Sequence, residues 1–148
     1  MKFITIAPVM VAILFTANAY AKCEGGSKTV FSCMTAKGKQ IEVCDAGKTI
    51  EYSFGKPQIK PEIVVKVPRK DASTSQWDGM GRYISYSVNI PNGSTSYNVF
   101  WAADQHTEDH AVEAGVNVET NNKLLATVNC SGKNIKQSLE GIDLKVTE

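Results

Sequence analysis

The 148-residue chain carries 16 Lys and Arg side chains against 15 Asp and Glu, so it is almost neutral. A neutral chain has no long-range field that gathers phosphates or anionic lipids, which excludes nucleic acid and membrane surfaces as expected partners. Its length suits one domain with one core, and no linker rich in Pro, Gly or Ser divides it.

The N-terminal residues have the composition of a secretory signal peptide. Lys2 precedes an uncharged, largely apolar run from Phe3 to Phe15, and Ala19-Tyr20-Ala21 supplies the small residues of a cleavage site. The run is shorter than the ~20 residues that a membrane-spanning helix needs. We therefore expect residues 1–21 to be removed, leaving residues 22–148 as a periplasmic or secreted domain with no net charge and no membrane insertion.

All four cysteines follow the expected cleavage site, in a chain bound for an oxidising compartment, so we expect them to form disulfides. A metal site is the weaker alternative because no two of them form a Cys-x-x-Cys pair. The sequence leaves the pairing open. We favour a bond that joins the last cysteine to the first hairpin or to the N-terminal segment, because a long closed loop restricts the unfolded chain most. The four are Cys23, Cys33, Cys44 and Cys130.

Eight runs rich in β-branched and aromatic residues predict strands along the chain. Residues 69–80 are mostly polar, and we expect an exposed excursion there. Asn92-Gly93, between two alternating runs, is the strongest hairpin signal. Eight short strands with hairpin connections predict a single-domain, all-β fold, an antiparallel β-sandwich or flattened barrel stabilised by disulfides. The expected strands are residues 29–34, 40–44, 49–54, 62–67, 83–90, 95–101, 112–118 and 124–130.

The first hairpin turns at Lys37-Gly38, where glycine accepts a positive φ. If these two residues form the whole loop, Cys33 faces Glu42 and lies diagonal to Cys44, an awkward geometry for a bond between the two cysteines.

At the other end of the chain, residues 131–148 carry a weak apolar pattern. This tail either packs against a sheet or frays.

His106 and His110 are four residues apart, a spacing that places two imidazoles on one face of a helix. A zinc or copper site also needs a third ligand and a helix, whereas Asp104–His110 is a polar connection with at most one helical turn. We expect a solvated loop, no metal and no cofactor. The chain lacks a catalytic motif such as Gly-x-Ser-x-Gly, and we expect it not to be an enzyme.

A short aromatic and glycine-rich segment is the strongest candidate for a target-binding loop. Gly79 and Gly81 bracket a methionine between Trp77 and the pair Arg82-Tyr83, so the backbone can bend while aromatic and cationic groups, which are enriched at binding hot spots, meet a partner. In the alternative interpretation, Trp77 and Tyr83 belong to the core and the glycines form a bulge.

Several of these features occur together in one known family. They are the signal peptide, the strand count, and the sequences Phe31-Ser32-Cys33, Lys39-Gln40-Ile41-Glu42-Val43-Cys44 and Gly81-Arg82-Tyr83. In them the chain resembles the small periplasmic lysozyme inhibitors of Gram-negative bacteria, of the C-type and i-type groups. The resemblance covers the mature chain in architecture, although its motif is short. It implies a β-barrel or sandwich that blocks lysozyme by inserting a loop into the substrate cleft.

The chain departs from the family's loop motif, which has the form Ser-Gly-x-Tyr or Ser-Gly-x-x-Tyr. The shorter form matches at Gly81 and Tyr83 but has Met80 in place of serine, and the longer form retains only the tyrosine. The serine hydroxyl that would reach the lysozyme carboxylates is absent in both alignments.

The resemblance implies a protein partner, lysozyme or a related cell-wall hydrolase, which the loop occludes without turnover. Arg82 would then pair with acidic groups of the cleft. Two other functions stay open: an immunity protein against another cell-wall toxin, acting through a different face, and a small periplasmic metal-binding protein that uses His106 and His110. The oligomeric state is not determined by the sequence.

Overall fold

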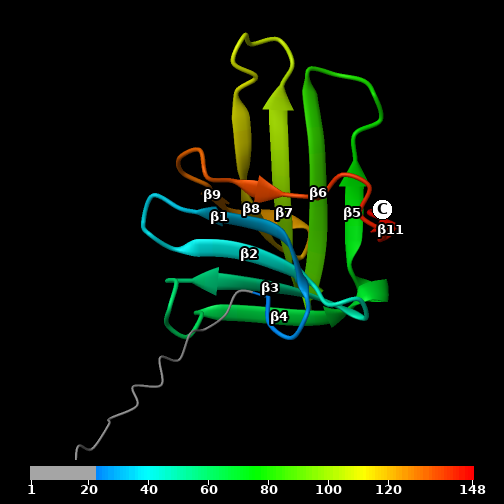
Figure 1. Cartoon of the computed structure of the whole chain (residues 1–148). Helices are drawn as coiled ribbons and strands as arrows, with labels where there is room; N and C mark the ends of the chain where they lie inside the picture. Colours follow the sequence, from blue (N-terminus) through cyan, green and yellow to red (C-terminus); the bar gives the residue numbers. More distant parts are fainter. Residues whose placement is uncertain (1–22) are drawn as a thin grey trace, which may run out of the picture.

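The computed structural model describes residues 23–148, which form two β-sheets packed face to face in a sandwich (Figure 1). This part of the chain contains eleven strands and one short 3-10 helix. Within it, no helix is both long and apolar enough to cross a membrane. The predicted signal peptide, residues 1–21, lies outside the described residues.

The first sheet is antiparallel and has the order β10-β1-β2-β3-β4. Ile41 pairs with Phe54 and Val43 with Tyr52, so apolar residues two apart along each strand share the face that meets the other sheet. The period-2 pattern of the sequence therefore sets which face is buried. The strands are β1 (Lys28–Met34), β2 (Gln40–Asp45), β3 (Thr49–Gly55), β4 (Ile63–Pro68) and β10 (Lys136–Gln137).

The second sheet has the order β11-β5-β6-β7-β8-β9 and is antiparallel except where β11 runs parallel to β5. The β6–β7 hairpin closes with Asn92 opposite Thr95, and Gly93 between them has φ +62°. From this turn the pairing continues without a slip to Tyr83 and Asp104. The strands are β5 (Ser73–Gln76), β6 (Tyr83–Asn92), β7 (Thr95–Asp104), β8 (Val112–Thr120), β9 (Lys123–Asn129) and β11 (Lys145–Val146).

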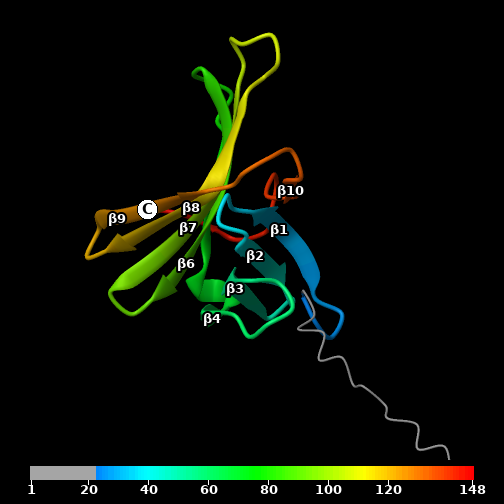
Figure 2. The ribbon, with the colours of Figure 1, turned by 90° about the vertical axis from the view of Figure 1, so that its left-hand side faces the viewer.

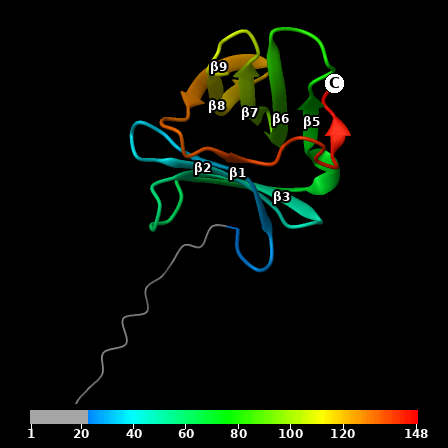
Figure 3. The ribbon, with the colours of Figure 1, turned by 45° about the horizontal axis from the view of Figure 1, so that its top comes forward.

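The core lies between the two sheets, whose strands run across one another (Figures 1 and 3). Tyr52 of the first sheet stacks on Tyr97 of the second, with ring centroids 4.7 Å apart and planes 23° apart. Around this pair lie Phe31 and a group of fully buried aliphatic side chains. Contact between aromatic rings of opposite sheets fixes how the layers sit on one another.

All four cysteines form disulfides. Cys33 in β1 bonds to Cys130, which follows β9, across 97 residues of sequence; this confirms the expected use of Cys130. The second bond joins Cys23 to Cys44 across 21 residues. The Cys33–Cys130 bond links the first sheet to the end of the second, so it closes the sandwich covalently.

The two-residue loop considered for the first hairpin is wrong. Thr35 donates its backbone N–H to Lys39 O, which leaves residues 36–38 as a three-residue loop. Cys33 therefore pairs with Ile41, and Ser32 takes the place opposite Glu42. Because the loop has three residues instead of two, the register of β1 against β2 is shifted by one position from the expected one. Cys33 therefore shares the face of Ile41, which is turned toward the core.

The eight expected strands are present, each within three residues of its predicted ends, but the count of eight is wrong because β5, β10 and β11 were missed. Residues 69–80 are not an exposed excursion throughout: they contain the 3-10 helix Arg69–Asp71 and β5, and Ala72 to Thr74 are buried. The C-terminal tail packs rather than frays, because Leu139 is fully buried against the core and both short tail strands pair with a sheet.

Candidate functional site

Two loops extend beyond the first sheet at one end of the second sheet (Figure 2). The first, residues 77–82, joins β5 to β6, and the second, residues 105–111, joins β7 to β8. We call the two loops, together with the adjoining Tyr83 and Asp104, the tip. Because Tyr83 pairs with Asp104 at the end of the β6–β7 ladder, the end of the first loop lies beside the start of the second. The predicted binding loop is therefore half of a two-loop surface.

An ion pair joins the two loops. Arg82 Nε donates to both carboxylate oxygens of Asp104 at 2.9 Å, and its Nη2 donates to Oδ2. Asp104 is only 5% exposed, whereas the Arg82 side chain is half exposed. The hydrogen bonds from Arg82 hold the pKa of Asp104 below its usual range, against the opposing effect of desolvation.

Gln105 adds two further links between the loops. Its backbone N–H donates to Arg82 O, and its side-chain Nε2 donates to Gly81 O, both at 2.9 Å. The guanidinium, the carboxylate and these two bonds hold the loops in one relative position. Such preorganisation reduces the entropy lost when a partner binds.

The first loop is also ordered internally. Trp77 donates its indole N–H to Met80 O at 2.8 Å, and Asp78 accepts the Met80 N–H at 3.0 Å. Gly79 and Gly81 have φ of +88° and +89°, a region that other residues rarely adopt. The glycines expected to let the segment bend do so at these two positions.

The structure supports a different interpretation for each of the two aromatic residues. Trp77 is partly buried and packs against the core cluster, which fits the core interpretation. Tyr83 is 42% exposed and Met80 is 72% exposed, so both are accessible to a partner. The guanidinium carbon of Arg82 lies 5.6 Å from the centroid of the Tyr83 ring.

The second loop is a series of turns in which the single helical turn considered for Asp104–His110 does not form. Asp104 Oδ1 accepts the backbone N–H of His106 at 2.9 Å, and His110 Nδ1 lies 3.2 Å from Asp104 O. Across residues 23–148, Cys23, Glu42 and Cys44 are the sole group of three or more His, Cys, Asp or Glu side chains close enough to hold a metal, and both sulfurs are in a disulfide. His106 and His110 belong to no such group.

The tip is acidic. Asp78, Glu108 and Asp109 are exposed there, and Arg82, its single Lys or Arg side chain, is already paired with Asp104. A surface of this charge attracts a partner whose overall face is basic.

Sequence reasoning missed Asp104 and Gln105 as members of the site. A signal for Asp104 was present, because counting pairs outward from the Asn92–Thr95 closure of the hairpin places it opposite Tyr83. No comparable pattern marks Gln105, whose contacts depend on how the second loop turns back.

We expect Asp104→Asn to destabilise the protein at pH 7 and to have a smaller effect at pH 3. The pKa of Asp104 is lowered in the folded state, so its ionised form stabilises the fold above about pH 4, the range of an unfolded carboxyl, and that contribution disappears as the pH falls through the folded pKa. Urea unfolding at the two pH values measures the difference. Asp109→Asn, at an exposed position of the same loop, is the control; an Asp104→Asn effect as large at pH 3 as at pH 7 would contradict this account.

In comparisons with known proteins, no family model, no curated protein and no solved structure gives a significant match to the chain.

Proposed function

We propose that this chain is an exported binding protein that occludes the cleft of a lysozyme or a related cell-wall hydrolase with its tip. The observation that carries the proposal is the pair of projecting loops joined by the Arg82–Asp104 ion pair. A projecting surface that is ordered before binding fits into a concave site at a low entropy cost.

The accessible side chains of the tip support a protein partner. Tyr83, Met80 and Arg82 offer an aromatic ring, a flexible thioether and a guanidinium, which are types enriched at the centres of protein interfaces. No arrangement of catalytic groups is needed for occlusion, because a bound loop blocks substrate without turnover.

The structure alters the role expected for Arg82 in this proposal. Its Nε and Nη2 already bind Asp104, so its first task is to position the loops. A guanidinium has five N–H donors, and those on Nη1 take no part in this pair. Met80 occupies the serine position of the shorter loop motif in the family that the chain resembles. It is the most exposed large apolar side chain of the tip.

The disulfides support an oxidising compartment, since such bonds persist in secreted and periplasmic proteins. This agrees with the expected signal peptide.

The test is an inhibition assay of the exported protein against c-, g- and i-type lysozymes. We expect inhibition of at least one type, and we expect Tyr83→Ala to weaken the complex by about 2 kcal/mol or more, as for a central aromatic contact. The melting temperature should barely change, because Tyr83 is half exposed. Met80→Ser, which brings the loop to the family's Ser-Gly-x-Tyr form, should strengthen inhibition.

Leu125→Ala is the matched control, because Leu125 is 71% exposed and lies on β9, outside the tip. It should leave inhibition unchanged. If the unaltered protein inhibits none of the three lysozyme types, the proposal is wrong; if it inhibits one and Tyr83→Ala has no effect, the tip is not the binding surface.

A further inference from the structure

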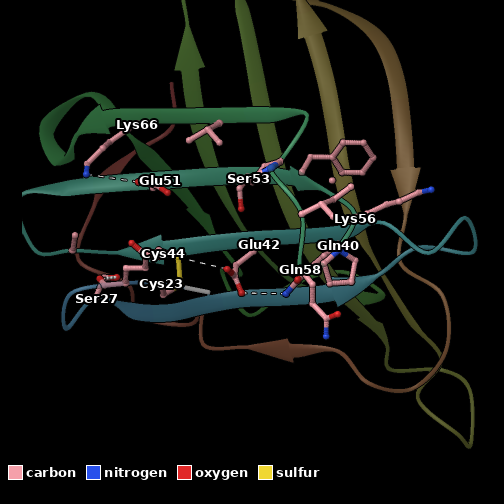
Figure 4. A pocket seen from close by; sticks show the side chains of 18 residues that line it. Cys23, Ser27, Gln40, Glu42, Cys44, Glu51, Ser53, Lys56, Gln58 and Lys66 are labelled. Atoms are coloured by element: carbon pink, nitrogen blue, oxygen red, sulfur yellow. Dashed lines mark hydrogen bonds and ion pairs between the residues drawn. A yellow bond between two sulfur atoms is a disulfide. The ribbon is translucent and has the colours of Figure 1, made fainter. Parts of the chain in front are cut away.

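Two surface features lie outside the tip, and the first is a pocket on the outer face of the first sheet, the face turned away from the core (Figure 4). It has a volume of about 330 Å³, and side chains of β2, β3 and β4 form its floor beside the Cys23–Cys44 disulfide. Glu42 is buried in this floor. Glutamates and lysines line the pocket together, and Glu51 is paired with Lys66 at 3.7 Å, so the lining favours neither a cation nor an anion.

The second feature is the edge strand β9, which is exposed along its length. It is the outermost strand in the order β11-β5-β6-β7-β8-β9, and no strand of residues 23–148 pairs with its outer side (Figure 2). Leu124 and Leu125 are 63% and 71% exposed, and Val128 alone in this strand is partly buried. An edge strand presents a row of backbone N–H and C=O groups that can pair with another chain.

The other three edges of the two sheets carry features that oppose such pairing. β10 and β11 are edge strands of two residues each. β4, the long edge of the first sheet, contains Lys66 and ends at Pro68. Short strands, lysine and proline are the usual protections of a sheet edge. β9 has seven residues, no proline, and a single charged residue at its start.

The ladder between β8 and β9 shows which backbone groups face the open edge. Just past the end of β9, the backbone N–H of Cys130 donates to Ala114 O at 2.8 Å. Hydrogen-bonded and non-hydrogen-bonded pairs alternate along an antiparallel ladder, and the register is regular from here back to residue 126. The even-numbered residues of this stretch therefore turn their backbone groups to β8. Those of Thr127 and Asn129 point to the open edge.

From this geometry we propose that the chain forms a dimer in which β9 pairs antiparallel with β9 of a second copy, about a two-fold axis at Thr127. Ala126 is the middle of the strand, but its backbone groups face β8, and Leu125 is the extra residue where the register slips. Thr127 is thus the most central residue with outward groups in regular pairing. Its N–H and C=O exchange two hydrogen bonds with Thr127 of the second copy, and the interface is the same patch on both chains.

The charges and side chains of β9 favour a second copy as the occupant. Lys123 is the single charged residue of the strand. In an antiparallel pair centred on Thr127, the two lysines lie at opposite ends, roughly 26 Å apart, beyond the range over which exposed charges act at physiological ionic strength. Ala126 falls opposite Val128 of the second copy, and threonine opposite threonine is a favourable cross-strand pair. The chain as a whole is almost neutral, so two copies do not repel one another.

The test is the mass of the exported, disulfide-bonded protein in solution, measured by light scattering over a range of concentrations. We expect the mass to rise from that of one chain toward that of two, because pairing of one edge gives a small interface and hence a concentration-dependent dimer. Thr127→Lys and Thr127→Glu each place like charges opposite one another across the axis. Either variant alone should stay a monomer where the unaltered protein is a dimer.

An equal mixture of Thr127→Lys and Thr127→Glu should dimerise again, because lysine on one copy then meets glutamate on the other. This rescue requires residue 127 of one chain to lie beside the same residue of the second. Ser75→Lys adds the same charge at an exposed position on β5 of the same sheet, and as the matched control it should leave the dimer intact.

Amide hydrogen exchange gives a second measurement that needs no variant. The N–H groups of Thr127 and Asn129 should exchange more slowly as the concentration of the unaltered protein rises, whereas those of β4, the other long edge strand, should not change.

A protein that stays a monomer at the concentration of the exchange experiment would overturn the proposal. So would a dimer that persists in both charge variants, or a mixture that does not dimerise, because the contact would then lie elsewhere. Slow exchange at Thr127 and Asn129 that is independent of concentration would show that another segment of the same chain covers the edge, and would also overturn it. The inhibition assay is independent of these outcomes, since no residue of β9 belongs to the tip.

Discussion

Replacing Cys33 and Cys130 together with alanine should lower the free energy of unfolding by about 4.7 kcal/mol, the chain-entropy value for a closed loop of 97 residues. The bond restricts the unfolded chain over most of its length, and it also joins the two sheets. Urea unfolding of the double variant and the unaltered protein, both without reductant, measures the loss. A single variant is unsuitable because it leaves a free thiol.

The Cys23–Cys44 bond provides the matched control. It closes a loop of 21 residues, for which the same relation gives about 3.3 kcal/mol. The double variant at Cys23 and Cys44 should therefore be the more stable of the two. The reverse order would mean that the shorter bond stabilises the folded sheet itself, and the loop-length explanation would fail.

Tyr52→Ala should destabilise the protein by about 3–5 kcal/mol, as for other buried aromatic side chains truncated to alanine. Tyr52 is 1% exposed and stacks on Tyr97 of the opposite sheet, so its removal leaves a cavity at the centre of the sandwich. Thermal and urea unfolding both report the loss. Tyr52→Phe keeps the ring and should retain most of the stability.

Tyr83→Ala is the corresponding change at the tip and should alter stability by less than about 0.5 kcal/mol, because the side chain is half exposed. The pair of tyrosine variants separates a structural role from a binding role. A loss of stability at Tyr83 close to that at Tyr52 would support the core interpretation of this residue and remove it from the candidate site.

The strands that were predicted and those that were missed differ in one physical property. The eight predicted strands carry alternating apolar residues, a local signal that can be recognised in the strand's own sequence without knowing which strands lie beside it. β5 reads Ser-Thr-Ser-Gln and has no apolar residue. It is a strand because β6 and β11 lie on either side and bind its backbone, and β10 and β11 are two-residue strands of the same kind.

The candidate site shows the same division. The exposed Tyr83 and the glycines of the first loop were identified from residue type and spacing. Asp104, the ion-pair partner of Arg82, lies at the end of β7, 22 residues further along the chain, and was not identified. Arg82 was expected to contact a target, whereas in the structure it positions the two loops. Burial of Glu42 had no sequence signal, because an alternating strand predicts that a glutamate between Ile41 and Val43 faces solvent.

The amino-acid sequence alone was enough to determine the all-β class, the positions of eight strands and the use of Cys130 in a disulfide. These follow from local alternation, turn-forming glycines and the entropy of closing a long loop. Only the tertiary structure decided the pairing of Cys23 with Cys44, the joining of two loops into one tip and the pocket over β2 and β3. Each of these depends on which distant segments meet, and that is set by the packing of two whole sheets rather than by any short stretch of residues.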